Sequence, residues 1–184
     1  LLGYTQSDEI TLVWEGQAEP PFGGRVQKLC SILAGMASAR FAQLVPEHLP
    51  SKADALPHFD CRVWSVPSWE QAYQVLRWRE ADATRNSLSM LAQANFSHKE
   101  LQGKGSREVH DMLHQKRVNW NDEPGWFKRG RHFARVSRLV PVPEEFRVPG
   151  ILEEARRTRV EPLDLLPVEA YDPETLLCQL RGLR

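Results

Sequence analysis

The sequence predicts an α+β fold, because extended runs near the start and near residue 135 flank two long stretches of helical periodicity. Residues 3–14 read as two strands on either side of Ser7-Asp8-Glu9, and apolar residues alternate along the second strand. The 184 residues suffice for one domain with a core and an appendage. We therefore expect a main domain over residues 1–140 and a Pro-rich C-terminal extension over residues 141–184.

Each remaining element follows from a local signal. Ser68 followed by Gln71 is a capping-box start for a long helix, and Gly103-Lys104-Gly105 splits the next helical stretch in two. Apolar residues at three- and four-residue spacing predict an earlier long helix. In chain order, the expected elements are a helix over 25–44, a strand over 59–66, a helix over 69–93, two short helices within 97–115, a strand over 131–142 and a short helix near 173–183.

Composition narrows the class of protein. The formal net charge is zero, but residues 97–138 carry ten Lys or Arg against five Asp or Glu, whereas residues 139–184 carry six against nine. A basic segment on a neutral protein suits a localised polyanion contact, with a solvated helical face as the alternative.

The three cysteines form no Cys-x-x-Cys clip, which favours a reducing, cytoplasmic location. No apolar run is long enough to span a bilayer, so we expect no membrane partner.

The acidic turn between the first two strands is a candidate metal site. Mg²⁺ prefers oxygen ligands and retains water, so one or two carboxylates together with substrate phosphates suffice to hold it. Asp8 and Glu9 supply two carboxylates next to a rigid strand. For the dipeptide alone, the alternative is an exposed acidic turn without a function.

Two helices carry further candidate residues. Arg25 and Lys28 lie in the first turn of a helix, where the helix dipole favours an anion. A bound triphosphate would satisfy both cations, whereas the alternative is that both simply face water. Along the later helix, short polar side chains recur at a spacing of three, four and three residues, which indicates fixed hydrogen bonding either to a ligand or within an inter-helix network. This polar stripe consists of Arg79, Asp82, Asn86 and Ser89, with Arg85 beside it.

The loop over residues 118–130 combines amide, aromatic and cationic side chains. Asn119, Trp120, Lys128 and Arg129 are of the types that stack bases and bind phosphates in nucleotides or single-stranded nucleic acid. A folded surface loop with buried Trp is the alternative.

Taken in order, these pieces resemble the tRNA(His) guanylyltransferase family. The resemblance covers roughly residues 3–130, and Ala83-Thr84-Arg85-Asn86-Ser87 is similar to the bacterial and archaeal like-protein branch, which is associated with template-directed repair of tRNA 5′ ends. The matching stretches are Gly3-Tyr4-Thr5-Gln6-Ser7-Asp8-Glu9, Phe22 to Lys28, Phe59 to Val63, Trp78 to Asp82, Arg85-Asn86-Ser87, Asn119 to Asp122 and Lys128-Arg129-Gly130.

The resemblance implies a polymerase-like palm, which is a ferredoxin-like antiparallel sheet with helices on one side. It implies addition of nucleotides to the tRNA 5′ end in the 3′-to-5′ direction, with two Mg²⁺ ions and with GTP and ATP as substrates. Family members form dimers and tetramers, so a homodimer or homotetramer is implied as well. The implied catalytic metal ligands are Asp8 and Glu9, the nucleotide would be bound by Ser7, Arg25, Lys28, Asp82 and Asn86, and Arg85, Asn119, Lys128 and Arg129 would contact triphosphate or tRNA.

One departure from the family concerns its first palm strand, which brings another metal-binding Asp. No matching Asp-Gly-Arg motif occurs in the sequence, and Asp60-Cys61-Arg62 lies on a different expected strand. We therefore expect a palm without its first strand, as in a fragment or one piece of a split protein, inactive or nearly so alone. Its exposed sheet edge would favour oligomerisation. A milder departure is Glu80, where the family often has Gln.

Two other functions fit part of these observations. A nucleotidyl cyclase also presents carboxylates on a hairpin turn, but it has no need of the Asp82 and Asn86 stripe or of the Lys128-Arg129-Gly130 loop. A non-catalytic module that binds tRNA or nucleotides would retain the scaffold without the chemistry.

Overall fold

The computed structural model describes residues 2–14, 16, 20–148 and 153–181 of the chain. These residues form two compact units, one from Leu1–Trp14 with Ser68–Arg184 and the other from Glu15–Pro67. The first unit contains β1 (Leu2–Gln6), β2 (Glu9–Val13), α2 (Trp69–Asn95), α3 (His98–Leu101), α4 (Ser106–Gln115), η3 (Trp120–Asp122), α5 (Gly125–Arg129), β3 (Arg131–Pro141), η4 (Glu144–Phe146), β4 (Glu154–Leu163), η5 (Val168–Ala170) and α6 (Pro173–Arg181), and the second contains η1 (Pro21–Gly24), α1 (Val26–His48) and η2 (Pro50–Lys52).

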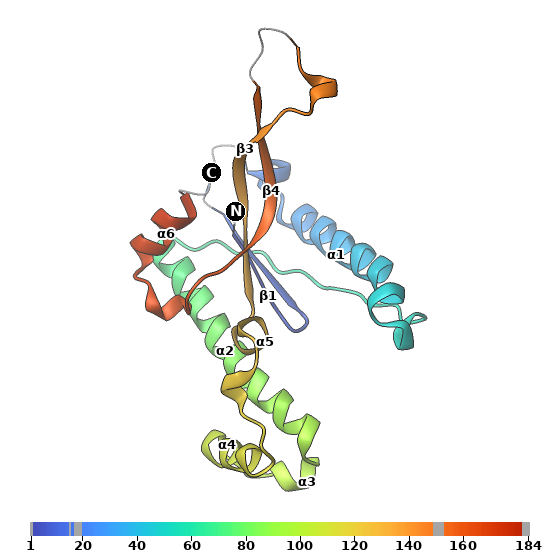
Figure 1. Ribbon diagram of the computed structural model, residues 1–184, viewed down its shortest axis with the longest axis vertical. Helices are drawn as coiled ribbons and strands as arrows, with labels where there is room; N and C mark the ends of the chain where they lie inside the picture. The colour runs from blue at the N-terminus through green and yellow to red at the C-terminus, as the bar shows by residue number, and fades with distance from the viewer. Residues whose placement is uncertain (1, 15, 17–19, 149–152, 182–184) are drawn as a thin grey trace. The chain divides into compact units, whose positions relative to one another are not determined.

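The first unit is built on a four-stranded antiparallel sheet with the order β2-β1-β3-β4 (Figure 1). Leu2 of β1 pairs with Val13 on one side and with Ala134 on the other. The sheet with its helices confirms the expected α+β class, and the first hairpin is also confirmed. Because β1 is paired along both edges, the turn that follows it is anchored in the sheet.

A helix packs on one face of this sheet. Leu2 and Tyr4 are two residues apart on β1, so both side chains point to the same face, where they are 4% and 2% exposed. They share a core with Tyr73 and Leu76 of α2. The apolar face of α2 is therefore what fixes this helix against β1.

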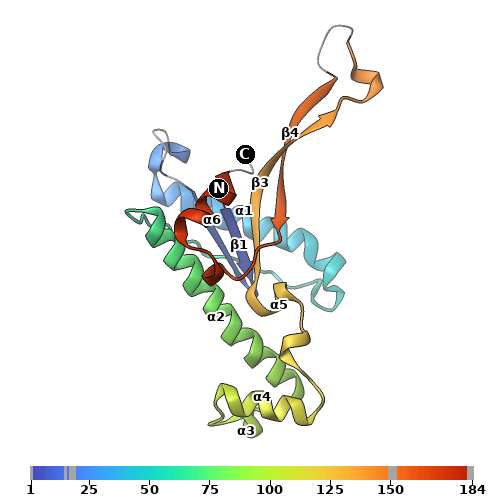
Figure 2. The same cartoon turned by 60° about the vertical axis from the view of Figure 1, so that its left-hand side comes forward.

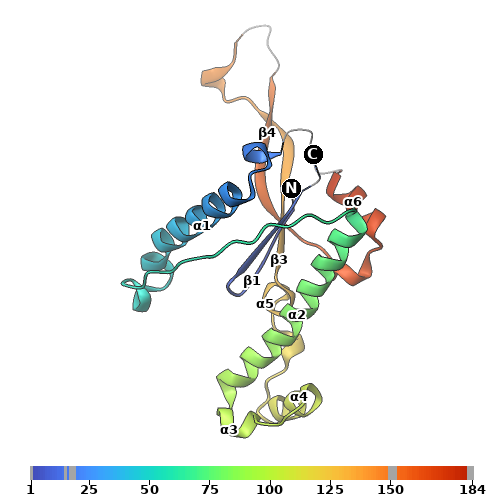
Figure 3. The same cartoon turned by 180° about the vertical axis from the view of Figure 1, so that it is seen from behind.

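The expected helix starts beyond residue 67 are confirmed. The Ser68 hydroxyl accepts from the Gln71 N–H at 3.4 Å and caps α2. The stretch that follows is divided into α3 and α4, and Gly103 in the break has a φ of +74°, a conformation that favours glycine. α4 then packs near the C-terminal end of α2 (Figure 3), in a second apolar core that includes Leu88 and Leu113.

The C-terminal part of the chain belongs to the same sheet and core. β4 pairs with β3 up to Pro141, whereas β1 reaches only Ala134 of β3, so the outer part of β3 and β4 is a two-stranded ribbon (Figure 2). Val168 of η5 and Leu176 of α6 are buried in the hydrophobic core that also contains residues of β1 and α2. The structure therefore divides the chain differently from the expected boundary at residue 140. The expected final helix is confirmed as α6, but β4 was not expected.

In the second unit, α1 confirms the expected helix and continues to His48. The expected strand over residues 59–66 is wrong, because residues 55–66 carry no regular secondary structure in the described chain. Burial nevertheless alternates with period two from Pro57 to Trp64. The segment is extended without being paired in a sheet.

Among the described residues, α1 alone is long and apolar enough to cross a membrane, with a mean hydropathy of 1.3 over its best window. This corrects the expectation that no such run exists. One such helix is weak evidence of a membrane span, although only 11% of its window is buried, unlike the core helix of a soluble protein. α1 also carries Lys28 and Arg40 within its length.

Candidate functional site

The tip of the β1–β2 hairpin and the polar stripe of α2 line one pocket of about 340 Å³. Both segments belong to the first unit. The structure thus brings together two features that lie far apart in the sequence. The lining residues are Gln6, Ser7, Asp8, Glu9, Asp82, Asn86, Ser89, Met90 and Gln93.

A tight turn places the acidic residues at the pocket. Gln6 pairs with Glu9 across the hairpin, so Ser7 and Asp8 form a two-residue loop. Ser7 has a φ of +53°, which suits the backbone twist of such short hairpin loops. Asp8 is exposed at the tip, and it makes no ion pair with any residue that the structure describes.

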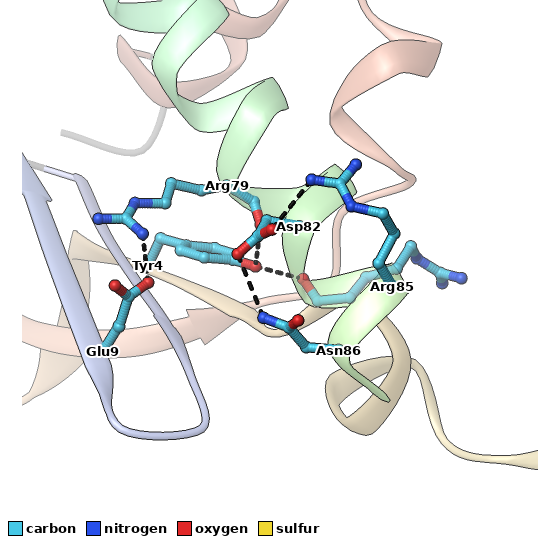
Figure 4. A network of polar contacts seen from close by, with 7 residues as sticks. Tyr4, Glu9, Arg79, Asp82, Arg85 and Asn86 are labelled. Atoms are coloured by element: carbon cyan, nitrogen blue, oxygen red, sulfur yellow. Dashed lines mark hydrogen bonds and ion pairs between the residues drawn. The ribbon is translucent and has the colours of Figure 1, made fainter. Parts of the chain in front are cut away.

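Glu9 is already engaged by α2. Its carboxylate forms an ion pair with the Arg79 guanidinium (Figure 4). The Arg79 side chain is only 20% exposed and stacks over the Trp78 ring with 4.7 Å between the guanidinium carbon and the ring centroid. Arg79 therefore ties the hairpin tip to the helix and neutralises one of the two adjacent carboxylates.

Asp82 is oriented by its own helix. Arg85 Nη2 donates to one carboxylate oxygen at 2.9 Å, and Asn86 Nδ2 donates to the other at 3.2 Å (Figure 4). These hydrogen bonds are of neither kind expected for the stripe, which were contacts to a ligand or an inter-helix network. They arise within α2, and they hold the polar atoms of Asp82 and Asn86 at the pocket wall.

The loop over residues 118–130 forms a separate cationic cluster, and none of its residues lines the pocket. Lys128 Nζ donates to the Asn121 carbonyl at 2.6 Å and lies 5.3 Å from the centroid of the Trp120 ring. The Trp120 indole N–H donates to Ser87 Oγ at 3.1 Å. Asn119 caps η3, because its side-chain oxygen accepts from the Asn121 N–H at 3.1 Å.

Glu80 is an important residue that the sequence analysis left without a role. It is 7% exposed, and its carboxylate accepts from the Val168 N–H at 2.5 Å and lies 3.9 Å from Arg129 Nε. Burial raises the pKa of this carboxyl, while the Val168 N–H and the Arg129 charge oppose the rise. A signal was available, since Glu80 lies on the same helical face as Leu76 and Ala83.

Arg25 and Lys28 lie in the second unit, and their proposed role stays a prediction. Arg25 is the residue before α1, and its Nε donates to the Phe22 carbonyl at 3.1 Å. Lys28 Nζ lies 5.4 Å from the centroid of the Phe22 ring. No acidic residue occupies the first turn of α1, so the helix start and both cations retain positive charge.

The donor set at the hairpin tip suits a weakly held hard cation. The described residues include no group of three or more His, Cys, Asp or Glu side chains arranged for a metal ion. Asp8 offers a free carboxylate, and Glu9 and Asp82 line the same pocket. Mg²⁺ is commonly bound by one or two carboxylates plus substrate phosphates, so these residues fit a magnesium ion that arrives with its nucleotide.

Known proteins resemble this chain over most of its length. A family model described as tRNAHis guanylyltransferase matches residues 1–67. The tRNA(His) guanylyltransferase of Saccharomyces cerevisiae is 24% identical over 77% of this chain and 65% of its own length, and that of Neurospora crassa is 27% identical over 76% and 52%. The chain therefore spans less than two thirds of either protein.

Two solved structures also match. Both are bacterial tRNA(His) guanylyltransferase-like proteins, one in complex with ATP and the other with GTP. The first has a TM-score of 0.71 and 30% identity, over 97% of this chain and 70% of that protein; the second has 0.63 and 28%, over 95% and 66%. The first of these structures is 30% identical to this chain, which covers 70% of it, and the family model and the pocket geometry agree with that match. This chain therefore belongs to the tRNA(His) guanylyltransferase family.

Proposed function

We propose that this protein is a nucleotidyltransferase that adds nucleotides to the 5′ end of tRNA, with GTP and ATP as substrates. The pocket shared by the Asp8 turn and the Asp82 stripe carries this proposal, since it offers carboxylates and amides at one concave site. Its volume of about 340 Å³ lies in the range of small-molecule sites. The ATP and GTP complexes of the two bacterial relatives support the choice of ligand.

The residues that line the pocket would have separate roles in this reaction. Asp8 and Glu9 would hold two Mg²⁺ ions with the substrate phosphates, and Ser7 would hold the nucleotide beside them. When bound, Mg²⁺ stabilises charge on the leaving pyrophosphate and lowers the pKa of the attacking hydroxyl. Asp82 and Asn86 would orient the nucleotide or the activated 5′ end, because their polar atoms are already fixed at the pocket wall.

Cationic side chains would bind the polyanion. Lys128 is prepositioned by Asn121 and Trp120, and Arg129 lies beside Glu80. With Arg85 and Asn119, they would contact triphosphate or tRNA backbone. Arg25 and Lys28 would bind triphosphate at the start of α1.

Further parts of this proposal are a polymerase-like palm, membership of the like-protein branch, a cytoplasmic location and a homodimer or homotetramer.

The decisive experiment incubates the protein with a tRNA that lacks its first 5′ nucleotide, Mg²⁺, ATP and labelled GTP. Because we expect the chain alone to be inactive or nearly so, the expected result is weak extension of the tRNA at high enzyme concentration, resolved on a gel. Asp8→Asn is the matched negative control, because it removes a charge at an exposed tip without changing side-chain size. If neither extension nor label transfer occurs at any enzyme concentration, the proposed reaction is wrong for this chain.

A non-catalytic module that binds tRNA or nucleotide is the second candidate. The observation that favours it is the Glu9–Arg79 ion pair, which leaves Asp8 as the only uncompensated carboxylate of the described turn. Salt-sensitive tRNA binding without extension would establish this function. Formation of a cyclic nucleotide from GTP without tRNA would instead establish a nucleotidyl cyclase.

A further inference from the structure

Cys30 and Cys61 come from distant segments of the sequence and meet within the second unit. Cys30 lies near the start of α1, and Cys61 lies in the extended segment over residues 55–66. Both are free thiols of intermediate exposure, and the Cys61 thiol lies near enough to Cys30 for Cys30 to contribute to the rise of its pKa. Cys61 Sγ donates to the Arg62 carbonyl at 4.0 Å. The proposed nucleotide chemistry uses neither residue.

Contacts with α1 align the extended segment along one face of the helix. The Phe59 N–H donates to Ser38 Oγ at 2.8 Å, and the Phe59 ring packs edge-on against Phe41 with 5.6 Å between ring centroids. Ser38, Ala34 and Cys30 are four residues apart in turn, so they share that face. After Phe59 the chain therefore runs toward the beginning of α1, which is the end of the helix that carries Cys30.

Alternating burial shows which side chains of this segment face α1. The half-buried residues are Pro57, Phe59, Cys61 and Val63, whereas His58, Asp60, Arg62 and Trp64 between them are exposed. Residues two apart in an extended chain point the same way. The packing that sets Phe59 on Phe41 thus also turns the Cys61 side chain toward α1, the helix that carries Cys30.

We propose that Cys30 and Cys61 form a reversible dithiol–disulfide pair that hydroperoxides oxidise. One thiolate reduces hydrogen peroxide, becoming a sulfenic acid and releasing one water; the second thiolate then attacks that sulfur and a second water leaves. Hydrogen peroxide and two thiols thus give one disulfide and two waters. A dithiol reductant reverses the change. The disulfide would bind the extended segment covalently to α1.

The reaction is expected to be faster at pH 8.5 than at pH 7. Burial, together with the neighbouring Cys30, raises the pKa of the Cys61 thiol, and the thiolate is the reactive form. The test therefore treats the full chain with hydrogen peroxide at pH 8.5. Intact mass, thiol titration and peptide mapping are the measurements. Cys178 is exposed, so a Cys178→Ser background removes disulfides that form between chains through Cys178.

In that background, the expected result is a loss of two hydrogen atoms in mass, no titratable thiol and one peptide pair linked through Cys30 and Cys61. Cys30→Ser and Cys61→Ser should each abolish this product. A trivalent arsenical, which binds two neighbouring thiols, should bind the unmodified background one to one, so the test does not depend on either Ser variant folding. Peroxide products confined to single cysteines, together with no arsenical binding, would overturn the proposal. These readouts are independent of nucleotide addition.

Discussion

The Tyr4 hydroxyl donates to the carbonyl oxygen of Arg129 at 2.8 Å, joining the interior strand β1 to the end of α5. The neighbouring carbonyl, that of Lys128, accepts from the Ser87 hydroxyl at 3.1 Å. Burial is the largest cause that raises the Tyr4 pKa, followed by the Glu80 charge, so the phenol stays a neutral donor. The hydroxyls of Tyr4 in β1 and Ser87 in α2 thus fix the backbone of Lys128 and Arg129.

Replacing Tyr4 by Phe tests this anchor. The Arg129 carbonyl would lose its buried donor, so the free energy of unfolding should fall by about 1–2 kcal/mol. Urea unfolding measures the change. Tyr171→Phe is the control, because the Tyr171 hydroxyl accepts from the Leu166 N–H at 3.2 Å at an exposed position and should matter less. Equal losses in the two variants would show that the Tyr4 contact is not special.

The glycine that follows Arg129 should tolerate no side chain. Gly130 has a φ of +78°, and an added Cβ would lie 2.7 Å from both the Thr5 carbonyl oxygen and the Tyr4 hydroxyl. Gly130→Ala should therefore cost about 2–4 kcal/mol of unfolding free energy. Gly103→Ala is the matched control, since Gly103 has a φ of +74° with no atom within 4 Å of a Cβ, and it should cost about 1 kcal/mol. Similar losses of unfolding free energy at both sites would show that the close approach of the added Cβ to Thr5 and Tyr4 is not the cause.

Local signals in the sequence predicted most elements of the first unit. The Ser68 cap and the glycine break between α3 and α4 are short-range features, and both were correct. The missed strand β4 is rich in Arg and Glu, and its pairing with β3 is a long-range contact that periodicity does not reveal. The wrong strand over residues 59–66 has real period-2 alternation. Its buried side faces a helix, however, and its backbone is not paired in a sheet.

The candidate site was predictable where residue type carried the information. The acidic turn and the Asp82 stripe were chosen for their chemistry, and the fold brings them to one pocket. Tyr4 and Glu80 were not assigned roles, because their partners are the Arg129 carbonyl and the Val168 N–H. Every residue except proline has both backbone groups, so sequence alone gives no indication of which one a side chain will bind.

Glu80→Gln should leave the protein at least as stable as wild type at pH 8. Burial raises the folded-state pKa of Glu80, so the ionised form is disfavoured in the folded protein, and this cost is relieved as pH falls through the raised pKa. Gln retains an acceptor for the Val168 N–H without the charge. Unfolding free energies at pH 5 and pH 8 should therefore differ less in the variant.

Glu80→Leu is the control for that variant. It leaves the Val168 N–H without its acceptor and should lower the unfolding free energy by about 2 kcal/mol. If Gln and Leu destabilise the protein equally, the charge rather than the hydrogen bond holds the C-terminal segment.

His132 should make the fold sensitive to acid. It is 5% exposed, its ring centroid lies 4.9 Å from that of Tyr4, and its Nε2 has no hydrogen-bond partner in the described structure. Burial lowers its pKa from 6.5 to about 4. Between pH 6.5 and about pH 4, His132 is protonated in the unfolded chain but neutral in the folded protein. The free energy of unfolding therefore falls with decreasing pH by up to about 3 kcal/mol.

His132→Leu should remove that part of the acid dependence. Chemical unfolding of both proteins at pH 7 and pH 4 measures it, with the wild type losing more free energy than the variant. An identical loss in both proteins would place the acid sensitivity in other groups.

Asp8→Asn should abolish nucleotide addition and weaken Mn²⁺ binding by about tenfold or more. Asp8 is exposed at the hairpin tip and makes no ion pair with the described residues, so its loss should change the unfolding free energy by less than about 0.5 kcal/mol. Electron paramagnetic resonance of Mn²⁺ measures binding directly, whether or not the chain extends tRNA. Asp111→Asn, at an exposed position of α4, is the matched control and should bind as wild type.

Glu9→Gln separates the two carboxylates of the turn. Because the Glu9 carboxylate is paired with Arg79, removing its charge should loosen the hairpin from α2, whereas removing that of Asp8 should not. Stronger amide exchange along β2 in Glu9→Gln, with wild-type protection in Asp8→Asn, is the expected pattern. Wild-type Mn²⁺ affinity in Asp8→Asn together with a loss in Glu9→Gln would reverse the assignment and make Glu9 the principal ligand, released from Arg79 when the ion binds.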